Sequence, residues 1–534
     1  MRLTASARAI SVKRRVCTGH MAGEQVRLCD LLAALSVATD SGMGQPPEKA
    51  IRSCLVATGL ARAMALPEEE VRDVYLATLL RHLGCTATAA EEAFWFGGDE
   101  LVSRPAAEPA DFADKREMLA VTLSTGRGAG WARPLLVARA LVGAKEDERI
   151  LRGVCEAGAA LAGRLGLTRP VRDSLSQVFE RWDGKGTPVG LAGDQITLPA
   201  RIADVATQVE IFHRVGGVDA ALAMVAERSG GWFDPKVADV VRRHGRRLLR
   251  EIGDADPWVA VLEAEPDPVA VVDETGVDRV ARAFAEMTDL KSTYTLSHST
   301  QVSALATAAA KALGLPSREV RDLGRAGLLH DLGRIAVSSG IWEKRRPLTR
   351  AEWEQIRLHP YHTERILTRS VPLERLGRIA GLHHERLDGS GYHRAAAAAA
   401  IPTSARVLAA ADAYQTLTQE RPHRAAVEPE RAADLVAAEA GRGRLDPDCV
   451  RAVIEAAGQV PRHVRVSPPA GLSDREIEVL QLVARGLSNR QIARELVISP
   501  RTAEHHVQHV YDKIGTSTRA GAALFAMEHD LLRR

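Results

Sequence analysis

The chain has 534 residues, enough for three to four domains of about 150 residues each. An apolar share of 46% and a charged share of 26% are typical of a soluble globular protein, and only 4% aromatic residues beside abundant alanine, leucine, arginine and glutamate favour a mainly α fold. The net charge of +3 gives no argument for nucleic acid, the six cysteines form no CxxC pair, and no apolar run reaches a membrane span. Neither a disulfide framework nor a thiolate zinc site is indicated, and we expect a cytoplasmic protein without a membrane partner.

The N-terminal segment, residues 1–24, is basic but lacks the apolar core of a signal peptide. We predict a disordered tail here. Met21 is a second candidate for the start of translation.

Three stretches of the chain recur in the same order. "ALPEEEVRDVYLATLLRHLG" (65–84) matches "GLPSREVRDLGRAGLLHDLG" (314–333), "FERWDGKGTP" (179–188) matches "HERLDGSGYH" (384–393), and "FDPKVADVV" (233–241) matches "LDPDCVRAVI" (445–454). The period is about 200 residues, too long for a solenoid, so the pattern predicts two tandem copies of one domain. We place the copies at 25–250 and 270–458, on either side of a proline-punctuated junction.

Both copies have the spacing of helical domains. In the second copy Thr349 and Glu352 form a capping box that predicts a helix start. "LGRAGLLHDLG" has helical periodicity and predicts a helix with Gly333 as its C-cap. The alanines 395–400 predict a loop insertion or a helix start.

Histidines and acids gather at five places of the second copy. They are His298, the pair His330 and Asp331, His359, the pair His383 and His384, and Asp412. Any one of them alone is best interpreted as a surface or capping residue. The matching positions of the first copy hold Lys49, Arg81, His82, Val178, Phe179 and Thr207. The surrounding sequence is retained in the first copy, whereas most of the histidines and acids that could bind a metal are replaced. This favours a metal site in the second copy only.

In these residues the second copy resembles the HD-GYP family of metal-dependent phosphohydrolases, a branch of the HD superfamily. The resemblance implies that the seven histidines and acids bind two metal ions between helices, with Asp331 as the bridging catalytic carboxylate. It also implies hydrolysis of cyclic di-guanylate. Arg334 stands where most members carry a lysine and is a second catalytic candidate for phosphate. Gly389, Gly391 and Tyr392 form the expected substrate loop.

The donor types bear on the metal. Imidazole and carboxylate without thiolate suit iron or manganese, with zinc left open. Two metals would lower the pKa of a bound water and neutralise charge on the phosphate. Tyr294 stands where members with a third metal carry a glutamate, so we expect two divalent ions. The signature Gly-Tyr-Pro ends in His393, a departure that bears on the substrate.

The first copy resembles a degenerate member of the same family. Its "RHLGCT" (81–86) has lost the ligand types, whereas "WDGKGTP" keeps the glycine turn. A sensor or pairing surface and a scaffold for the second copy both fit.

A linker (459–470) leads to a tail domain (471–534) with dense boundary signals. Ser473 with Glu476 and Ser488 with Gln491 are capping boxes, Gly486 ends a helix, and Ser499-Pro500 opens another. Two short helices around a tight turn predict a helix-turn-helix, although a small helical bundle shares this pattern.

The tail resembles the LuxR/GerE-type DNA-binding domain. The resemblance rests on Leu472, Arg475, Glu476, Leu480, Gly486, Asn489, Ile492, Ala493, Leu496, Ser499, Thr502, His506, Lys513, Gly515 and Arg519. It implies that the helix from Pro500 lies in the major groove of double-stranded DNA and that the helix after Thr518 forms a homodimer contact.

Within the tail, helix periodicity places Glu504, His505 and Gln508 on or beside one face as candidate base contacts, with Val507 and Val510 facing inward. Asn489, Arg501 and Lys513 are candidate phosphate contacts, and Thr502 completes the expected DNA-binding set. An alternative for Glu504 is a cap or an ion pair with Arg501.

Together these features predict a bacterial regulator in which a phosphohydrolase is combined with sequence-specific DNA binding. The alternative is a transcription factor whose HD-GYP-like pair senses a nucleotide without significant turnover.

Overall fold

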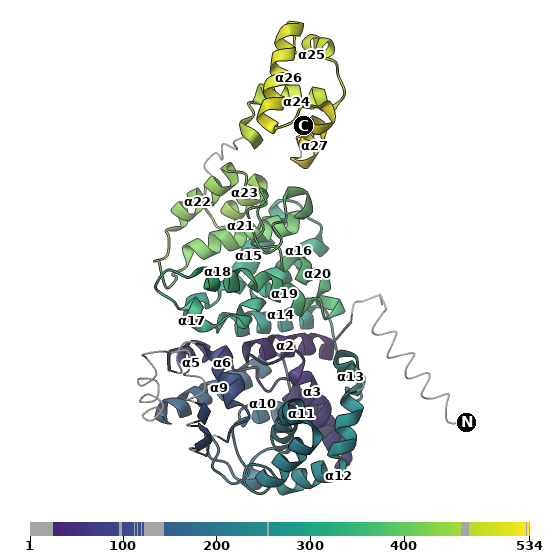
Figure 1. The fold of residues 1–534 in the computed structure, drawn as a ribbon, viewed down its shortest axis with the longest axis vertical. Helices are drawn as coiled ribbons and strands as arrows, with labels where there is room; N and C mark the ends of the chain where they lie inside the picture. The colour runs from purple at the N-terminus through teal and green to yellow at the C-terminus, as the bar shows by residue number, and fades with distance from the viewer. Residues whose placement is uncertain are drawn as a thin grey trace, which may run out of the picture. The chain divides into compact units, whose positions relative to one another are not determined.

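The computed structural model describes residues 25–95, 99–111, 113–114, 116–118, 120–121, 144–253, 256–460, 469–529 and 531–532 (Figure 1). The predicted tail 1–24 and most of the linker 459–470 lie outside these residues. The described chain is helical, apart from one two-stranded antiparallel sheet that pairs β1 (Val26–Arg27) with β2 (Val271–Val272). None of its helices combines the length and the apolar character needed to cross a bilayer.

Contact density divides the chain into two compact units. The first consists of Met1–Thr300, Leu328–Gly381 and Arg421–Ala425, and the second of Gln301–Gly327, Leu382–Glu420 and Ala426–Arg534. These two units do not coincide with the two copies of the sequence repeat. The limits of the copies stay a prediction.

Most of the helices belong to the first unit. They are α2 (Leu28–Gly42), α3 (Lys49–Ala63), α4 (Glu68–Leu79), α5 (Ala89–Trp95), α6 (Glu100–Ala107), α9 (Ala144–Arg164), α10 (Arg169–Leu175), α11 (Leu198–Arg228), α12 (Pro235–Gly253), α13 (Pro257–Ala264), α14 (Glu274–Asp289), α17 (Ser339–Trp342), α18 (Arg350–Arg357), α19 (His359–Leu367) and α20 (Glu374–Ala380), with 3-10 helices η2 (Gly193–Gln195), η3 (Thr293–Thr295), η4 (Leu332–Ala336) and η5 (Val371–Leu373).

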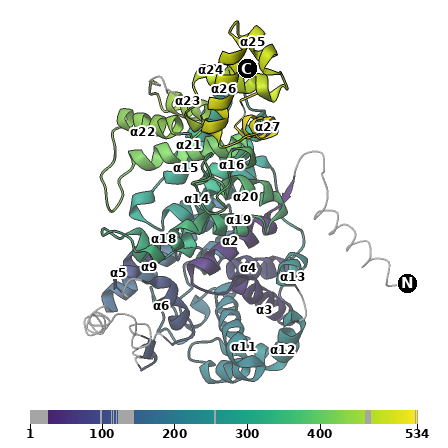
Figure 2. The ribbon, with the colours of Figure 1, turned by 45° about the horizontal axis from the view of Figure 1, so that its top comes forward.

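Helix α2 is central to this unit because nearly all of its residues are buried. It packs against η4 and α19, and both views draw α2 close to α19 (Figures 1 and 2). A second core lies among α3, α4, α11 and α12, where Phe233, Leu60 and Val74 are fully enclosed.

The second unit contains the remaining helices. They are α15 (His298–Ala312), whose first turn counts with the first unit, α16 (Ser317–Leu329), η6 (Ala398–Ala400), α21 (Thr403–Thr418), α22 (Pro429–Gly441), α23 (Pro447–Ala456), η7 (Pro469–Gly471), α24 (Asp474–Ala484), α25 (Asn489–Glu495), α26 (Pro500–Ile514) and α27 (Arg519–Glu528). The alanine run 395–400 therefore ends in one 3-10 turn.

The two copies repeat one device at the start of matching helices. In the first copy Asp40, at the end of α2, accepts a hydrogen bond from the N–H of Ala50 at 3.1 Å. In the second copy Asp289, at the end of α14, accepts from the N–H of Ser299 at 3.1 Å and from its hydroxyl at 2.7 Å. The helices that these carboxylates cap, α3 and α15, each have 15 residues and begin at Lys49 and His298.

The predicted boundary signals are mostly confirmed. Thr349 and Glu352 form a reciprocal capping box, as do Ser473 and Glu476. Gly486 follows α24 with φ +83°. The predicted C-cap at Gly333 is wrong, because α16 ends at Leu329 and Gly333 lies inside η4.

Candidate metal centre

The glycine of the "HDLG" stretch sets the approach of two elements. A Cβ on Gly333 would lie 2.0 Å from the carbonyl oxygen of His359 and 2.5 Å from the backbone nitrogen of Thr363, so η4 touches the backbone of α19. The hydroxyl of Thr363 donates to the carbonyl of His330 at 2.9 Å and accepts from the N–H of Gly333 at 2.8 Å. Gly333 is therefore required because the backbone of α19 leaves no room for a side chain at this position. It does not end a helix.

Asp331 lies among three imidazoles. Its Oδ2 is 3.5 Å from Nε2 of His298 and 3.5 Å from Nε2 of His330, and its Oδ1 is 3.3 Å from Nε2 of His359. All four side chains are buried. Burial by itself raises the pKa of Asp331, but the charges of His330 and Arg334 and a hydrogen bond from His359 outweigh it and hold the pKa well below its usual range.

His359 has a fixed tautomer in this arrangement. Its Nδ1 lies 2.6 Å from the carbonyl oxygen of Ile356, and a carbonyl can only accept, so Nδ1 carries the proton. Nε2 then faces Asp331, and in the neutral ring it is the nitrogen that a metal ion would bind. This second hydrogen bond is the kind that orients metal-binding histidines.

The second unit brings three further predicted ligands together. The rings of His383 and His384 lie 4.1 Å apart, and Nδ1 of His384 is 3.7 Å from Oδ2 of Asp412. The hydroxyl of Thr416 donates to the other oxygen of Asp412 at 3.1 Å. His383 is fully buried, whereas the His384 side chain is 21% exposed and therefore reachable.

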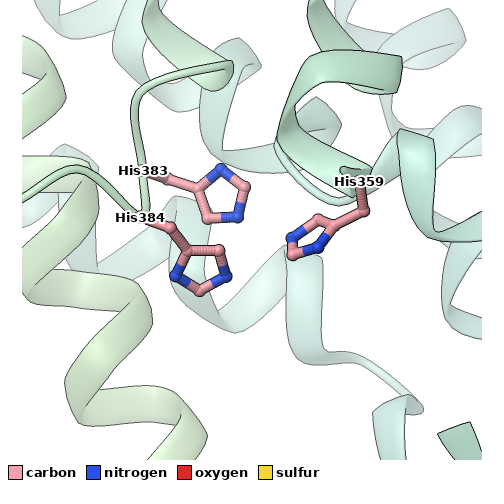
Figure 3. A group of neighbouring side chains, drawn as sticks. All are labelled: His359, His383 and His384. Carbon is pink, nitrogen blue, oxygen red and sulfur yellow. The ribbon is translucent and has the colours of Figure 1, made fainter. Parts of the chain in front are cut away.

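Among the residues that the structure describes, three groups of side chains have ligand atoms within 4.8 Å of one another. They are His359, His383 and His384 (Figure 3), then His298, His330 and Asp412, and finally His330, Asp331 and His383. Together the groups contain all seven predicted ligands and no other residue. Buried imidazoles and carboxylates in this number suit divalent ions of intermediate softness and need no thiolate.

The first copy fills the matching positions with its own charges. The ammonium of Lys49, at the position of His298, is 1% exposed and lies 2.9 Å from Nε2 of His82. It also donates to Glu108, whose Oε1 is 3.2 Å from Nε2 of His82. The pKa of His82 is lowered to about 4, mainly by burial and secondly by the charge of Lys49. A lysine thus supplies here the positive charge that a metal ion would supply.

A second ion pair lies at the other degenerate positions. Arg81, which replaces His330, donates to Asp204 at 2.7 Å and to the carbonyl of Val178 at 2.6 Å. At the positions that match the metal centre, the buried charges of the first copy are therefore paired with its own side chains.

Arg334 lies beside the Asp331 cluster. Its NH1 donates to Oδ2 of Asp331 at 2.9 Å, and its Cζ is 4.0 Å from the ring centre of Trp342. The Arg334 side chain is 13% exposed and therefore not fully enclosed.

The predicted substrate loop folds back on the "HHE" stretch. A Cβ on Gly391 would lie 2.5 Å from the backbone nitrogen of Arg386, and Gly389 has φ +75°. The ring of Tyr392 is 4.7 Å from that of His384.

Sequence reasoning assigned no role to Glu385. Its two oxygens accept from the N–H groups of Arg394 and Ala396 at 2.7 and 2.9 Å, so it clamps the loop. The signal was present in the repeat, because Glu180 of the first copy accepts from Val189 and Leu191 in the same way.

The tail domain has the predicted helices, with α25 and α26 as the helix pair. Glu504, His505 and Gln508 are exposed, as are Arg501 and Thr502, while Val507 and Val510 are buried as predicted. A hollow of about 350 Å³ on α26 is lined by Ser499, Arg501, Thr502, His505, His506 and His509.

Two predicted phosphate contacts have partners inside the domain. The ammonium of Lys513 donates to Glu476 at 2.7 Å and to the carbonyl of Gly471 at 2.9 Å. The side-chain oxygen of Asn489 accepts from Arg519 at 2.8 Å. Both residues therefore have structural roles besides any contact with DNA.

Comparisons with known proteins agree with these features. The HD domain model matches residues 132–237 and 282–449, and the model of bacterial regulatory proteins of the luxR family matches 470–526. The 3'3'-cGAMP-specific phosphodiesterase 3 of Vibrio cholerae is 30% identical over 81% of this chain and 95% of its own length. A cyclic di-GMP phosphodiesterase of Pseudomonas aeruginosa is 37% identical over 36% of this chain and 47% of its own.

A crystal structure of a cyclic GMP-AMP-specific phosphodiesterase of V. cholerae has the same fold. It superposes with a TM-score of 0.57 and 27% identity over 82% of this chain and 99% of that one. The chain therefore belongs to the HD domain family of metal-dependent phosphohydrolases and carries a luxR-family helix-turn-helix at its C-terminal end.

Proposed function

We propose that this protein is a phosphodiesterase for 3'3'-linked cyclic dinucleotides whose tail domain binds specific DNA sequences. The observation that carries the enzymatic part is the buried Asp331 among His298, His330 and His359. Outside a catalytic or metal site, a buried acid would not need three imidazole neighbours.

The seven residues of the ligand groups would hold two divalent ions, iron or manganese by donor type. Bound there, such ions would activate water as a nucleophile near neutral pH and would compensate charge on the phosphate. Asp331 would hold an ion as an anionic carboxylate, because its pKa lies well below its usual range.

The other residues act on the substrate. Arg334 offers a phosphate oxygen those N–H donors that Asp331 does not use. Tyr392, close to His384, presents an aromatic ring at the edge of the site. Glu385 holds this loop by two backbone hydrogen bonds, so the ring has a fixed position.

The substrate class follows from the relatives, one named for 3'3'-cGAMP and another for cyclic di-GMP. Both substrates share a phosphodiester ring and a guanine. We propose cyclic di-guanylate and 3'3'-cGAMP as the substrates to compare.

The test is hydrolysis by the full-length protein loaded with Mn²⁺ or Fe²⁺ under anaerobic conditions. Each cyclic dinucleotide is incubated with wild type and with Asp331→Ala, and the products are separated by chromatography. Metal-dependent linear dinucleotide or mononucleotide from wild type alone supports the proposal. Tight binding without any product favours the alternative, a transcription factor that senses the nucleotide.

DNA binding is supported by the exposed face of α26 and by the luxR-family match. Leu524 and Met527 on α27 are 58% and 66% exposed, which fits a homodimer contact through this helix. A dimer should select duplexes with two-fold symmetric half-sites. Selection from a random duplex library tests both points, since an asymmetric single site would contradict the dimer.

A further inference from the structure

Trp342 connects two predicted residues of the metal centre. It ends α17 and is partly buried. The Cζ of Arg334 lies 4.0 Å from its ring centre, and its indole N–H donates to the carbonyl of Arg334 at 3.3 Å. Its ring also meets that of His359 edge-on at 5.8 Å.

These contacts hold the Arg334 guanidinium from two directions. One N–H is used on Asp331 at 2.9 Å, and the indole ring packs against the cation. An arginine has five N–H donors, so others stay available. An arginine side chain loses rotamer entropy when it is fixed, and the Trp342 contact fixes it before substrate arrives.

The tryptophan is itself anchored by buried charges. Glu100, fully buried, accepts from the N–H of Ser339 at 2.8 Å and from the hydroxyl of Ser338 at 3.1 Å. The buried ammonium of Lys291 donates to the same carboxylate at 2.6 Å. The start of α17 is therefore rigid, and Trp342 follows three residues after Ser339.

We propose that Trp342 is a positioning residue that holds the Arg334 guanidinium for a phosphate oxygen of the cyclic dinucleotide. This inference rests on the proposed function and adds to it a residue with no ligand or acid–base chemistry of its own. Tryptophan is the best of the aromatic rings for packing against a cation. Its indole N–H additionally fixes the Arg334 backbone, which phenylalanine cannot do.

A double-mutant cycle on the full-length, Mn²⁺-loaded protein tests the proposal with Trp342→Ala, Arg334→Ala and the double variant. Since cation–π contacts contribute about 0.5–2 kcal/mol, Trp342→Ala should lower kcat/KM roughly 3- to 30-fold. In the Arg334→Ala background the same substitution should have no further effect. Trp342→Phe, which keeps a ring, should recover most of the activity.

Two results would overturn the inference. If the fold losses in kcat/KM of the two single variants multiply in the double variant, Trp342 does not act through Arg334. Loss of bound metal from Trp342→Ala would show that it acts through His359 instead. The matched control is Trp353→Ala, an indole that is 48% exposed on α18 and should change nothing.

Dissociation constants separate this inference from the proposed function. If wild type binds the cyclic dinucleotide without cleaving it, turnover fails, and the same cycle measured on Kd decides the role of Trp342. If wild type cleaves and the cycle is multiplicative, the inference alone fails. If wild type neither binds nor cleaves either dinucleotide, both fail.

Discussion

At the scale of single residues, Asp331 and His383 carry the metal hypothesis. Both belong to one group of ligand atoms within 4.8 Å, and both are buried. Asp331→Ala and His383→Ala should each lower the bound metal, because each removes a ligand that no neighbour replaces. Elemental analysis of the purified proteins measures this, with circular dichroism as the control for the fold. Unchanged metal stoichiometry in both variants would rule out the site.

Glu504 is the residue that should set one base preference. It is exposed on α26, and the structure shows no ion pair between Glu504 and Arg501 among the described residues. A carboxylate accepts from the cytosine amino group, whereas a lysine favours guanine. Glu504→Lys should change the selected base at one position of each half-site. An identical motif for both proteins would remove Glu504 from base recognition.

Arg501 gives the contrasting control. It is exposed beside the N-terminus of α26 and is not engaged as Lys513 is. Arg501→Ala should weaken all duplexes alike and reduce the salt dependence by about one ion.

At the scale of elements, the contact of η4 with α19 depends on one missing side chain. Gly333→Ala would place a Cβ 2.0 Å from the carbonyl oxygen of His359. The neighbouring atoms belong to the backbone of α19, so they cannot move aside without shifting the helix. We expect a loss of about 1–3 kcal/mol in the free energy of unfolding and weaker metal binding, because His359 moves. Gly253→Ala is the control, since nothing lies within 4 Å of its Cβ position. Equal melting temperatures for the two variants would contradict the packing argument.

The start of α24 gives a prediction for pH. Hydrogen bonds from Lys513 and from the N–H of Ser473 lower the pKa of Glu476 from 4.5 to about 2. A depressed pKa stabilises the fold fully above pH 4.5, and that stabilisation is lost as the pH falls from 4.5 to 2. Lys513→Met should therefore lower the melting temperature of the tail domain near pH 7, and the difference from wild type should shrink across this window. A pH-independent difference would exclude this linkage.

At the scale of the whole molecule, the matched helices α3 and α15 provide a paired experiment. Each begins with a buried residue, which is Lys49 in the first copy and the proposed metal ligand His298 in the second. His298→Ala should lower the bound metal. Lys49→Ala should leave the metal content unchanged but cost about 3–5 kcal/mol of stability, because Glu108 stays buried without its ammonium. Metal analysis and thermal melting of both full-length variants test this. Metal loss from Lys49→Ala would contradict a metal-free first copy.

Much of the architecture was predictable because its signals are local or repeated. The helical class, the caps at Thr349 and Ser473 and the buried Val507 and Val510 follow from periodicity and capping. The ligand set came from comparing the copies, and the structure brings all seven residues together. The role of Gly333 was not predictable, because it depends on α19, some 26 residues later in the chain.

Long-range polar partners were missed for the same reason. Glu108 lies 59 residues from Lys49, and Glu476 lies 37 residues before Lys513. No local spacing indicates such pairs. Trp342 was also missed, since a lone aromatic in a sequence is most simply a core residue.

The buried ammonium of Lys49 has an evolutionary consequence. A histidine restored at this position would leave Glu108 without a cation, and Arg81 would still occupy the place of the second ligand. Each single step back towards a metal site therefore passes through a less stable protein, and recovery requires several substitutions at once. The buried pairs of the first copy therefore depend on one another, and a change of one residue alone leaves a charge without its partner.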